Sequence, residues 1–370
     1  MTALLLLLLT ALSPVARAIE EQPRNFRGIR SEGMGGVLYT TGNYSESLFG
    51  NPARLSEVDT WKFTMLETMV ELNTNLIGST SSLSNLKSAS GASTISGASS
   101  LIGQNEHLLF QMMTAYYDPT FIGDLGFAFG LYAGAHTNLT VNFTTDVDSQ
   151  TIMDVGPNFG FSHPFFNNQL SVGLNLHFLY RVSADSTLSS LDFLTGKKLA
   201  LSNFGNQGFG VDADLGAYYH IPWELPWTRI SIGMTISSLL KTHYSDLNAA
   251  LMSGLGSRPT NNDRLIHWGV RFDFPDWWWF TAPLFSMEIQ DTGDSQKRIS
   301  FAKKTHFGTE GKLSRVFSLR LGLNQGYPTA GLGIDLPVVK LDLSTYGEEL
   351  TGNAGGLEDR RVALRLAFEL

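Results

Sequence analysis

Long runs of strictly alternating apolar and polar residues constrain this chain more than any other feature. In 169–182, apolar residues such as Leu174 alternate with polar or small ones such as Asn175. A period of two is typical of a β-strand with one apolar and one polar face. The runs are roughly ten to fourteen residues long, whereas strands of globular proteins are usually about 5–6. The length favours a membrane-spanning barrel over a soluble β-sandwich, which also alternates.

The composition fits a chain that faces lipid. Charged residues are only 16%, hydrophobic residues are 43%, and there are 37 glycines. The formal net charge of -8 argues against a nucleic-acid partner. The absence of cysteine excludes disulfides, thiolate metal sites and thiol nucleophiles. Membrane lipid is therefore the expected surrounding of the protein.

The N-terminus predicts export. An apolar run, Leu4 to Leu9, is followed by Pro14 and by Ala16-Arg17-Ala18, the small-x-small pattern of a cleavage site. Residues 1–18 are therefore predicted to be a signal peptide. An uncleaved anchor is the alternative, but the run is shorter than the roughly 20 residues that span a bilayer. Since no later run is long enough either, the exported chain is expected to cross a membrane as a barrel.

Counting strands back from a periplasmic C-terminus predicts an all-β fold, a transmembrane antiparallel β-barrel of 14 strands. Both termini then lie in the periplasm of a bacterial outer-membrane protein, and the long connections fall on the outer side. Residues 137–147 could be a further strand, but an odd number would misplace the N-terminus, so they are predicted to be a loop. The predicted strands are 59–72, 106–117, 123–134, 151–162, 168–182, 206–220, 227–238, 263–275, 283–291, 301–311, 315–324, 328–335, 337–346 and 359–370.

Five of the seven tryptophans fall in two inner turns of this barrel. They are Trp223, Trp227, Trp277, Trp278 and Trp279, and prolines bracket both groups. Tryptophan is enriched where a membrane protein crosses the headgroup region. The alternative is a tryptophan cluster in a soluble core. The prolines at the strand ends favour the membrane interface.

Residues 19–58 precede the first strand and do not alternate. They carry Arg24, Arg27 and Arg30 together with a glycine run. Irregular backbone cannot face lipid, because its polar groups would be unsatisfied. A fourteen-stranded barrel also leaves an open lumen unless something fills it. The segment is therefore predicted to be a plug, followed by the barrel at 59–370.

The plug carries two motifs, Gly33-Met34-Gly35-Gly36 and Asn51-Pro52-Ala53. Their order and spacing resemble the N-terminal hatch of the long-chain fatty acid transporter superfamily, which includes the barrel component of the type IX secretion system. The resemblance implies passive passage of long-chain fatty acids or other hydrophobic small molecules, with a shifting hatch. It marks Gly33, Gly35, Gly36, Asn51, Pro52 and Ala53 as plug residues. The chain departs from the family at Asn43 to Ser47, where an acidic residue is common, and at its last residue, Leu370.

The connection 73–105 is unusually apolar for an outer loop. Such a loop could form a groove that captures a hydrophobic ligand, or it could be a Ser/Gly-rich linker with incidental leucines. The candidate groove residues are Leu76, Ile77, Leu83, Leu86, Ile95, Leu101 and Ile102.

Five arginines are predicted to face the lumen. They could bind an acidic headgroup, or they could pair with lumen acids and hold the plug in place, and the second role is the commoner one. They are Arg181, Arg229, Arg271, Arg320 and Arg365.

The sequence carries neither a Gly-x-Ser-x-Gly nor a His-Glu-x-x-His motif. Its eight histidines show no metal-ligand spacing. We therefore predict no enzymatic activity, no cofactor and no metal. The alternative to a channel is a scaffold that binds partner proteins at the cell surface through 183–205 and 239–262.

The alternation also makes a prediction about stability. Leu174→Arg on the lipid face should cost about 2–4 kcal/mol. Asn175→Arg on the lumen face should be tolerated far better.

Overall fold

The computed structural model describes residues 24, 26–79, 102–141, 146–189, 205–223, 225–245, 258–293 and 299–370. The signal peptide predicted for 1–18 lies outside these residues. Among the described residues, no helix has the length and apolar character needed to span a membrane.

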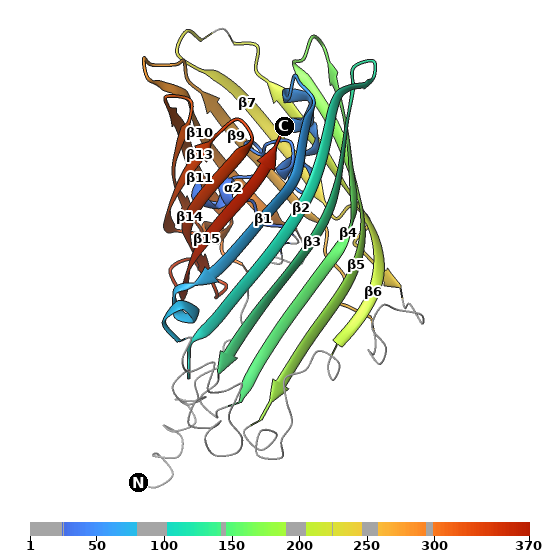
Figure 1. The fold of residues 1–370 in the computed structure, drawn as a ribbon, viewed down its shortest axis with the longest axis vertical. Helices are drawn as coiled ribbons and strands as arrows, with labels where there is room; N and C mark the ends of the chain where they lie inside the picture. The colour runs from blue at the N-terminus through green and yellow to red at the C-terminus, as the bar shows by residue number, and fades with distance from the viewer. Residues whose placement is uncertain are drawn as a thin grey trace.

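The chain forms a closed antiparallel barrel around its own N-terminal segment (Figure 1). Fourteen strands make the ring, because β1 pairs with β15 and β5 pairs with β6, while the two-residue β8 pairs only with β6. The predicted fold is therefore confirmed. The strands are β1 (Lys62–Asn73), β2 (Asn105–Ile122), β3 (Leu125–Val141), β4 (Val147–Phe165), β5 (Leu170–Leu188), β6 (Gly205–His220), β7 (Arg229–Ser237), β8 (Tyr244–Ser245), β9 (Leu265–Asp273), β10 (Phe280–Thr292), β11 (Thr305–Leu313), β12 (Phe317–Asn324), β13 (Tyr327–Asp335), β14 (Val339–Glu349) and β15 (Glu358–Glu369).

Strands β2 to β5 are longer than predicted, with 17 to 19 residues each. The loop predicted at 137–147 is wrong for this reason. Residues up to Val141 extend β3, and β4 begins at Val147, which pairs with Val141. The segment is not a strand of its own either, so the predicted count of fourteen holds. Strand pairing simply continues past the apolar stretch that the sequence pattern detects.

The two ends of the barrel differ. We call the end with the short turns and the C-terminus the turn end, and the opposite end the loop end (Figure 1). Six tryptophans lie at the turn end, and their side chains are all exposed. The five tryptophans predicted to lie together are thus found at one end of the barrel, with Trp61 as a further member, while their contact with a membrane interface stays a prediction. These residues are Trp61, Trp223, Trp227, Trp277, Trp278 and Trp279.

The two faces of the wall are chemically distinct. On β5, Leu174 points outward and is half-buried, whereas Asn175 points inward and is fully buried. The Asn175 side chain donates a hydrogen bond to the Ser47 carbonyl oxygen at 2.8 Å. Asn175 is therefore not the tolerant lumen position expected from the sequence, because an arginine there would collide with the N-terminal segment.

A fairer comparison of the two faces uses Val155 and Ile152, both on β4. Val155 points outward and is 45% exposed, while Ile152 points inward and lines a cavity. Val155→Arg should lower the free energy of unfolding in lipid vesicles by about 2–4 kcal/mol, because the arginine would face hydrocarbon. Ile152→Arg should cost much less. Equal losses in urea-unfolding experiments would mean that the outer face does not contact lipid.

The N-terminal segment lies inside the barrel, and we call its described residues 26–58 the hatch. It contains the helix α2 (Ile29–Gly33) and the 3-10 helices η1 (Glu46–Leu48) and η2 (Pro52–Glu57). A further 3-10 helix, η4 (Ala302–Lys304), precedes β11. Helix α2 contacts β12 to β15, and η2 contacts β3 to β6, which lie across the ring. The hatch therefore bridges two opposite walls.

Candidate functional site

The glycine run of the hatch docks backbone to backbone on one wall. Gly33 lies against Gly331, and Gly35 lies against Gly322 and the carbonyl oxygen of Phe307. Gly35 and Gly36 adopt φ values of +74° and +81°, a conformation that other residues rarely adopt. The predicted motif thus sits where only glycine allows both the turn and the close approach.

The Asn-Pro-Ala motif docks on the opposite wall. Asn51 caps η2 by accepting the Ala53 N–H at 3.1 Å, and its amide donates to the Ala217 carbonyl oxygen of β6 at 3.0 Å. Pro52 and Ala53 lie against Gly173, where a Cβ would be 2.5 Å from the Ala53 nitrogen. All six predicted plug residues are therefore at contacts between hatch and barrel.

Charged side chains link the hatch to the wall through a chain of buried ion pairs. Arg30 of the hatch contacts Glu310 at 2.9 and 2.8 Å, and Glu310 also contacts Arg320 at 2.6 Å. The chain continues through Asp342, Arg365 and Glu67, so that it crosses from β11 to β1. We call these six residues the arginine–carboxylate chain. On the same side, Arg27 donates to Tyr346 and Glu348.

The five arginines predicted in the lumen all have carboxylate neighbours. Arg320 and Arg365 belong to the arginine–carboxylate chain, and Arg271 contacts Asp273. Arg229 is exposed at the turn end, 3.9 Å from Asp273. Only Arg181 lines the luminal cavity described below, and both its Nε and Nη2 bond Asp154 at 2.7 Å. For the four arginines other than Arg229, the geometry favours the role of holding the lumen together, one of the two roles left open by the sequence, whereas the side chain of Arg229 is 62% exposed and does not have this role.

Glu32 of the hatch is buried among these charges. It is 1% exposed, its Oε1 lies 3.4 Å from Arg24 and 3.7 Å from Arg27, and no described residue forms a hydrogen bond with its Oε2. Burial raises the pKa of Glu32 to about 7, although the two arginines act to lower it. The docked hatch therefore binds this proton more tightly than an undocked one, in which the pKa is near 4.5.

This pKa predicts that the contribution of Glu32 to docking weakens as the pH rises. That contribution is complete below about pH 4.5, is lost as the pH rises to about 7, and is constant above that. A single cysteine introduced at the buried Ser47 would report undocking by its rate of maleimide labelling. Between pH 5 and pH 8 the rate should rise at least about tenfold more in the wild type than with Glu32→Gln, since one pKa unit corresponds to a tenfold change. Identical pH profiles would contradict the prediction.

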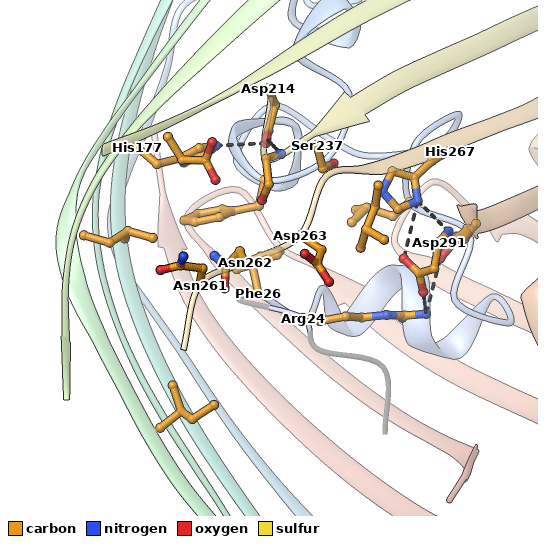
Figure 2. A pocket seen from close by; sticks show the side chains of 18 of the residues that line it. Arg24, Phe26, His177, Asp214, Ser237, Asn261, Asn262, Asp263, His267 and Asp291 are labelled. Atoms are coloured by element: carbon orange, nitrogen blue, oxygen red, sulfur yellow. Dashed lines mark hydrogen bonds and ion pairs between the residues drawn. The ribbon is translucent and has the colours of Figure 1, made fainter. Parts of the chain in front are cut away.

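A cavity of about 250 Å³ lies between the hatch and the loop end of the barrel (Figure 2). The hatch contributes Phe26, Leu38, Tyr39 and Phe49 to its lining, and the wall contributes Ile152, Leu179 and Leu265. The Phe26 and Phe49 rings are stacked with centroids 4.6 Å apart. Tyr39 stacks on His267 at 3.8 Å. The cavity therefore has an aromatic floor, which belongs to the hatch.

Polar side chains surround this floor (Figure 2). His177 contacts Asp214 at 2.9 Å and Asn158 at 2.7 Å. The ring Nδ1 of His267 accepts the Asp291 N–H at 3.0 Å, so a neutral His267 carries its proton on Nε2, which has no hydrogen-bond partner in the part of the chain that the structure describes. A cavity that combines apolar surface with a few convergent polar groups is typical of a small-molecule site.

The predicted groove in 73–105 lies mostly outside the described residues, including Leu83, Leu86, Ile95 and Leu101. Leu76 and Ile77 belong to a helical stretch at 74–79, where Ile77 is 52% exposed. Ile102 forms an isolated bridge with Val141. The groove therefore remains a prediction.

Five residues of the cavity lining were not predicted from the sequence as candidate site residues. They are Phe26, Phe49, Asp212, Asp214 and Asp291. Asp212 and Asp214 alternate with apolar residues in 206–220, so their inward direction could have been inferred. Phe26 and Phe49 could not be identified in this way, because apolar and polar residues do not alternate in the sequence of the hatch.

Solved structures of hydrocarbon channels share this architecture. They include a TodX mutant monoaromatic hydrocarbon channel (TM-score 0.56, 14% identity, 93% of this chain and 98% of that one). The CymD monoaromatic hydrocarbon channel is similar, with a TM-score of 0.53, 14% identity, and coverage of 92% of this chain and 96% of that one. The Ralstonia pickettii toluene transporter TbuX is also similar, with a TM-score of 0.52, 14% identity, and coverage of 93% of this chain and 97% of that one. No family model matches the chain, and no curated protein matches it by sequence. The chain shares the barrel fold of these channels, so the resemblance inferred from the sequence is confirmed at the level of the fold.

Proposed function

We propose that this protein is an outer-membrane channel for the passive uptake of hydrophobic small molecules. The observation that carries the proposal is the cavity of about 250 Å³ with an aromatic floor, held inside a hatch-filled barrel of fourteen strands. The likeness to hydrocarbon channels supports it. The turn end would face the periplasm, and residues 1–18 would direct export.

The wall of the barrel suggests the route. Each strand of the ring is hydrogen-bonded to both neighbours, and β3 pairs without interruption with β4 from Gly126 to Val141. On the other side of β4, Gly156 and Pro157 alone interrupt the pairing with β5. A molecule in the cavity would therefore meet the hatch on its way to the turn end. Movement of the hatch between its two docking walls would open that route.

Uptake by cells that lack their own transporter tests the proposal. Labelled toluene and labelled oleate cover the hydrocarbons named for the neighbours and the fatty acids implied by the sequence resemblance. Ile152→Trp should reduce uptake because it fills the cavity, whereas Met153→Trp, on the outer face of the same strand, should not. No uptake of either compound, despite a folded barrel in the outer-membrane fraction, would overturn the proposal.

The scaffold alternative depends on the connections 183–205 and 239–262. Residues 190–204 and 246–257 of these connections lie outside the described part of the chain. No specific observation favours this role over transport.

A further inference from the structure

Negative charge accumulates around the luminal cavity. The lining includes Asp212, Asp214, Asp263 and Asp291, and Asp154 lies directly behind it. Arg24 and Arg181 are the arginines of the lining, and Arg181 is already paired with Asp154. Among the described residues, an excess of carboxylates remains even when His177 is counted as protonated.

Asp212 and Asp214 differ from other carboxylates in the lumen in the partners that they contact. Elsewhere, Glu310 and Asp342 each contact two arginines. Asp212 instead accepts hydrogen bonds from the backbone N–H groups of Ala213 and Leu240 and from the Thr242 hydroxyl. Among the described residues, the hydrogen-bond partners of Asp214 are His177 and the Ser238 backbone N–H alone. No arginine or lysine in the described part of the chain therefore forms an ion pair with Asp212 or Asp214.

The buried carboxylate of Asp291 supports the same conclusion without depending on the count of charged residues. Asp291 is 3% exposed and lines the cavity; its Oδ1 lies 3.6 Å from His267, while its Oδ2 lies 4.0 Å from Arg24 and has no hydrogen-bond partner among the described residues (Figure 2). Asp263, on the same cavity, is exposed and has no ion pair among the described residues. A buried carboxylate oxygen without a donor is costly, so a ligand that donates a hydrogen bond would be favoured there.

The aromatic floor points to the same ligand chemistry. Phe26, Phe49 and Tyr39 line the cavity with the parts of their rings that the stacking contacts leave open, and these provide apolar contact for a hydrophobic body. Aromatic faces also attract cations, more strongly where water is excluded. A carboxylate in this cavity would face like charges, with no unpaired arginine to offset them.

We propose that the cavity selects hydrophobic compounds that carry a cationic amino group over those that carry a carboxylate. This inference rests on the proposed channel function and specifies its substrate class. The hydrophobic body lies on the aromatic floor, and the ammonium group lies toward Asp263 and Asp291.

Three probes with one hydrophobic body test the inference by titration calorimetry of the folded protein at pH 7. They are 2-phenylethylamine, 2-phenylethanol and phenylacetate. The amine should bind at least about tenfold more tightly than phenylacetate, a difference of about 1.4 kcal/mol. Equal or tighter binding of phenylacetate would overturn the inference.

Matched variants locate the effect. Asp263→Asn together with Asp291→Asn should weaken amine binding about tenfold, while the affinity for 2-phenylethanol should stay within about twofold. Asp263→Asn alone alters an exposed side chain, so it provides a variant that keeps the fold. Asp185→Asn removes the same charge from an exposed position of β5 outside the cavity lining and should change nothing. Unchanged amine binding in the double variant would contradict the inference.

The uptake assay separates the two proposals. Uptake of toluene or oleate, combined with no tighter binding of the amine, would contradict the proposed selectivity but would still support the proposed channel function. Absence of uptake would remove the channel, whatever the order of binding affinities.

Discussion

Gly322→Val is expected to displace the hatch and open the barrel to ions. A Cβ at this position would lie 2.5 Å from the Met34 carbonyl carbon, so the clash is with hatch backbone, which cannot rotate away. Overpacking of this kind costs about 1–3 kcal/mol. The undocked population should therefore rise at least about fivefold, and more with Gly173→Val in addition, since that change obstructs the opposite wall.

Conductance in planar bilayers measures this opening, because a fourteen-stranded ring without its hatch would leave an aqueous lumen. The control is Leu321→Val on the same strand, which introduces the same side chain on the outer face, where Leu321 is 60% exposed. Unchanged conductance in the double glycine variant, with the barrel folded, would show that these glycines do not hold the hatch.

Glu310→Gln is expected to lower the free energy of unfolding by about 3–5 kcal/mol. Removing one partner of a buried ion pair costs about this much, and although Arg320 keeps Asp342, Arg30 loses the carboxylate that it contacts most closely. Glu310 contacts both Arg30 of the hatch and Arg320 of the wall, so a single substitution affects two guanidinium groups. Urea unfolding in vesicles, followed by tryptophan fluorescence, measures the change.

Asp335→Asn is the matched control for Glu310→Gln. Asp335 pairs with Lys312 at 2.6 Å, but the two side chains are 20% and 35% exposed. A pair that water screens contributes about 0–1 kcal/mol. Similar losses for the two variants would mean that the arginine–carboxylate chain does not stabilise the barrel.

The strands could be predicted because alternation needs only local sequence. All fourteen ring strands overlap their predicted ranges, and the errors are at the ends. Thr137 to Val141 continue β3 because β4 supplies hydrogen-bond partners, which no local pattern reveals. Alternation reflects the two different faces of the barrel wall, whereas pairing with the neighbouring strand sets the strand length.

The cavity could not be predicted because it depends on contacts across the lumen. Arg30 and Glu310 are separated by 280 positions, and Phe49 meets His177 only through the folded hatch. The docking walls of the hatch could have been predicted from glycines in the strands. Isolated glycines in a strand, such as Gly173 and Gly322, indicate close approach of another backbone. They mark both docking walls of the hatch.

The placement of the hatch has a consequence for the order of assembly. The hatch is synthesised first, yet its docking partners on β11 to β13 follow almost 300 residues later in the chain, as for Gly35 and Thr329 with a separation of 294. Such distant contacts are slow to form, because the intervening loop must close first. The ring closes where β1 meets β15, the first and last strands. Seating of the hatch is therefore expected as a late kinetic step, after most of the barrel has formed.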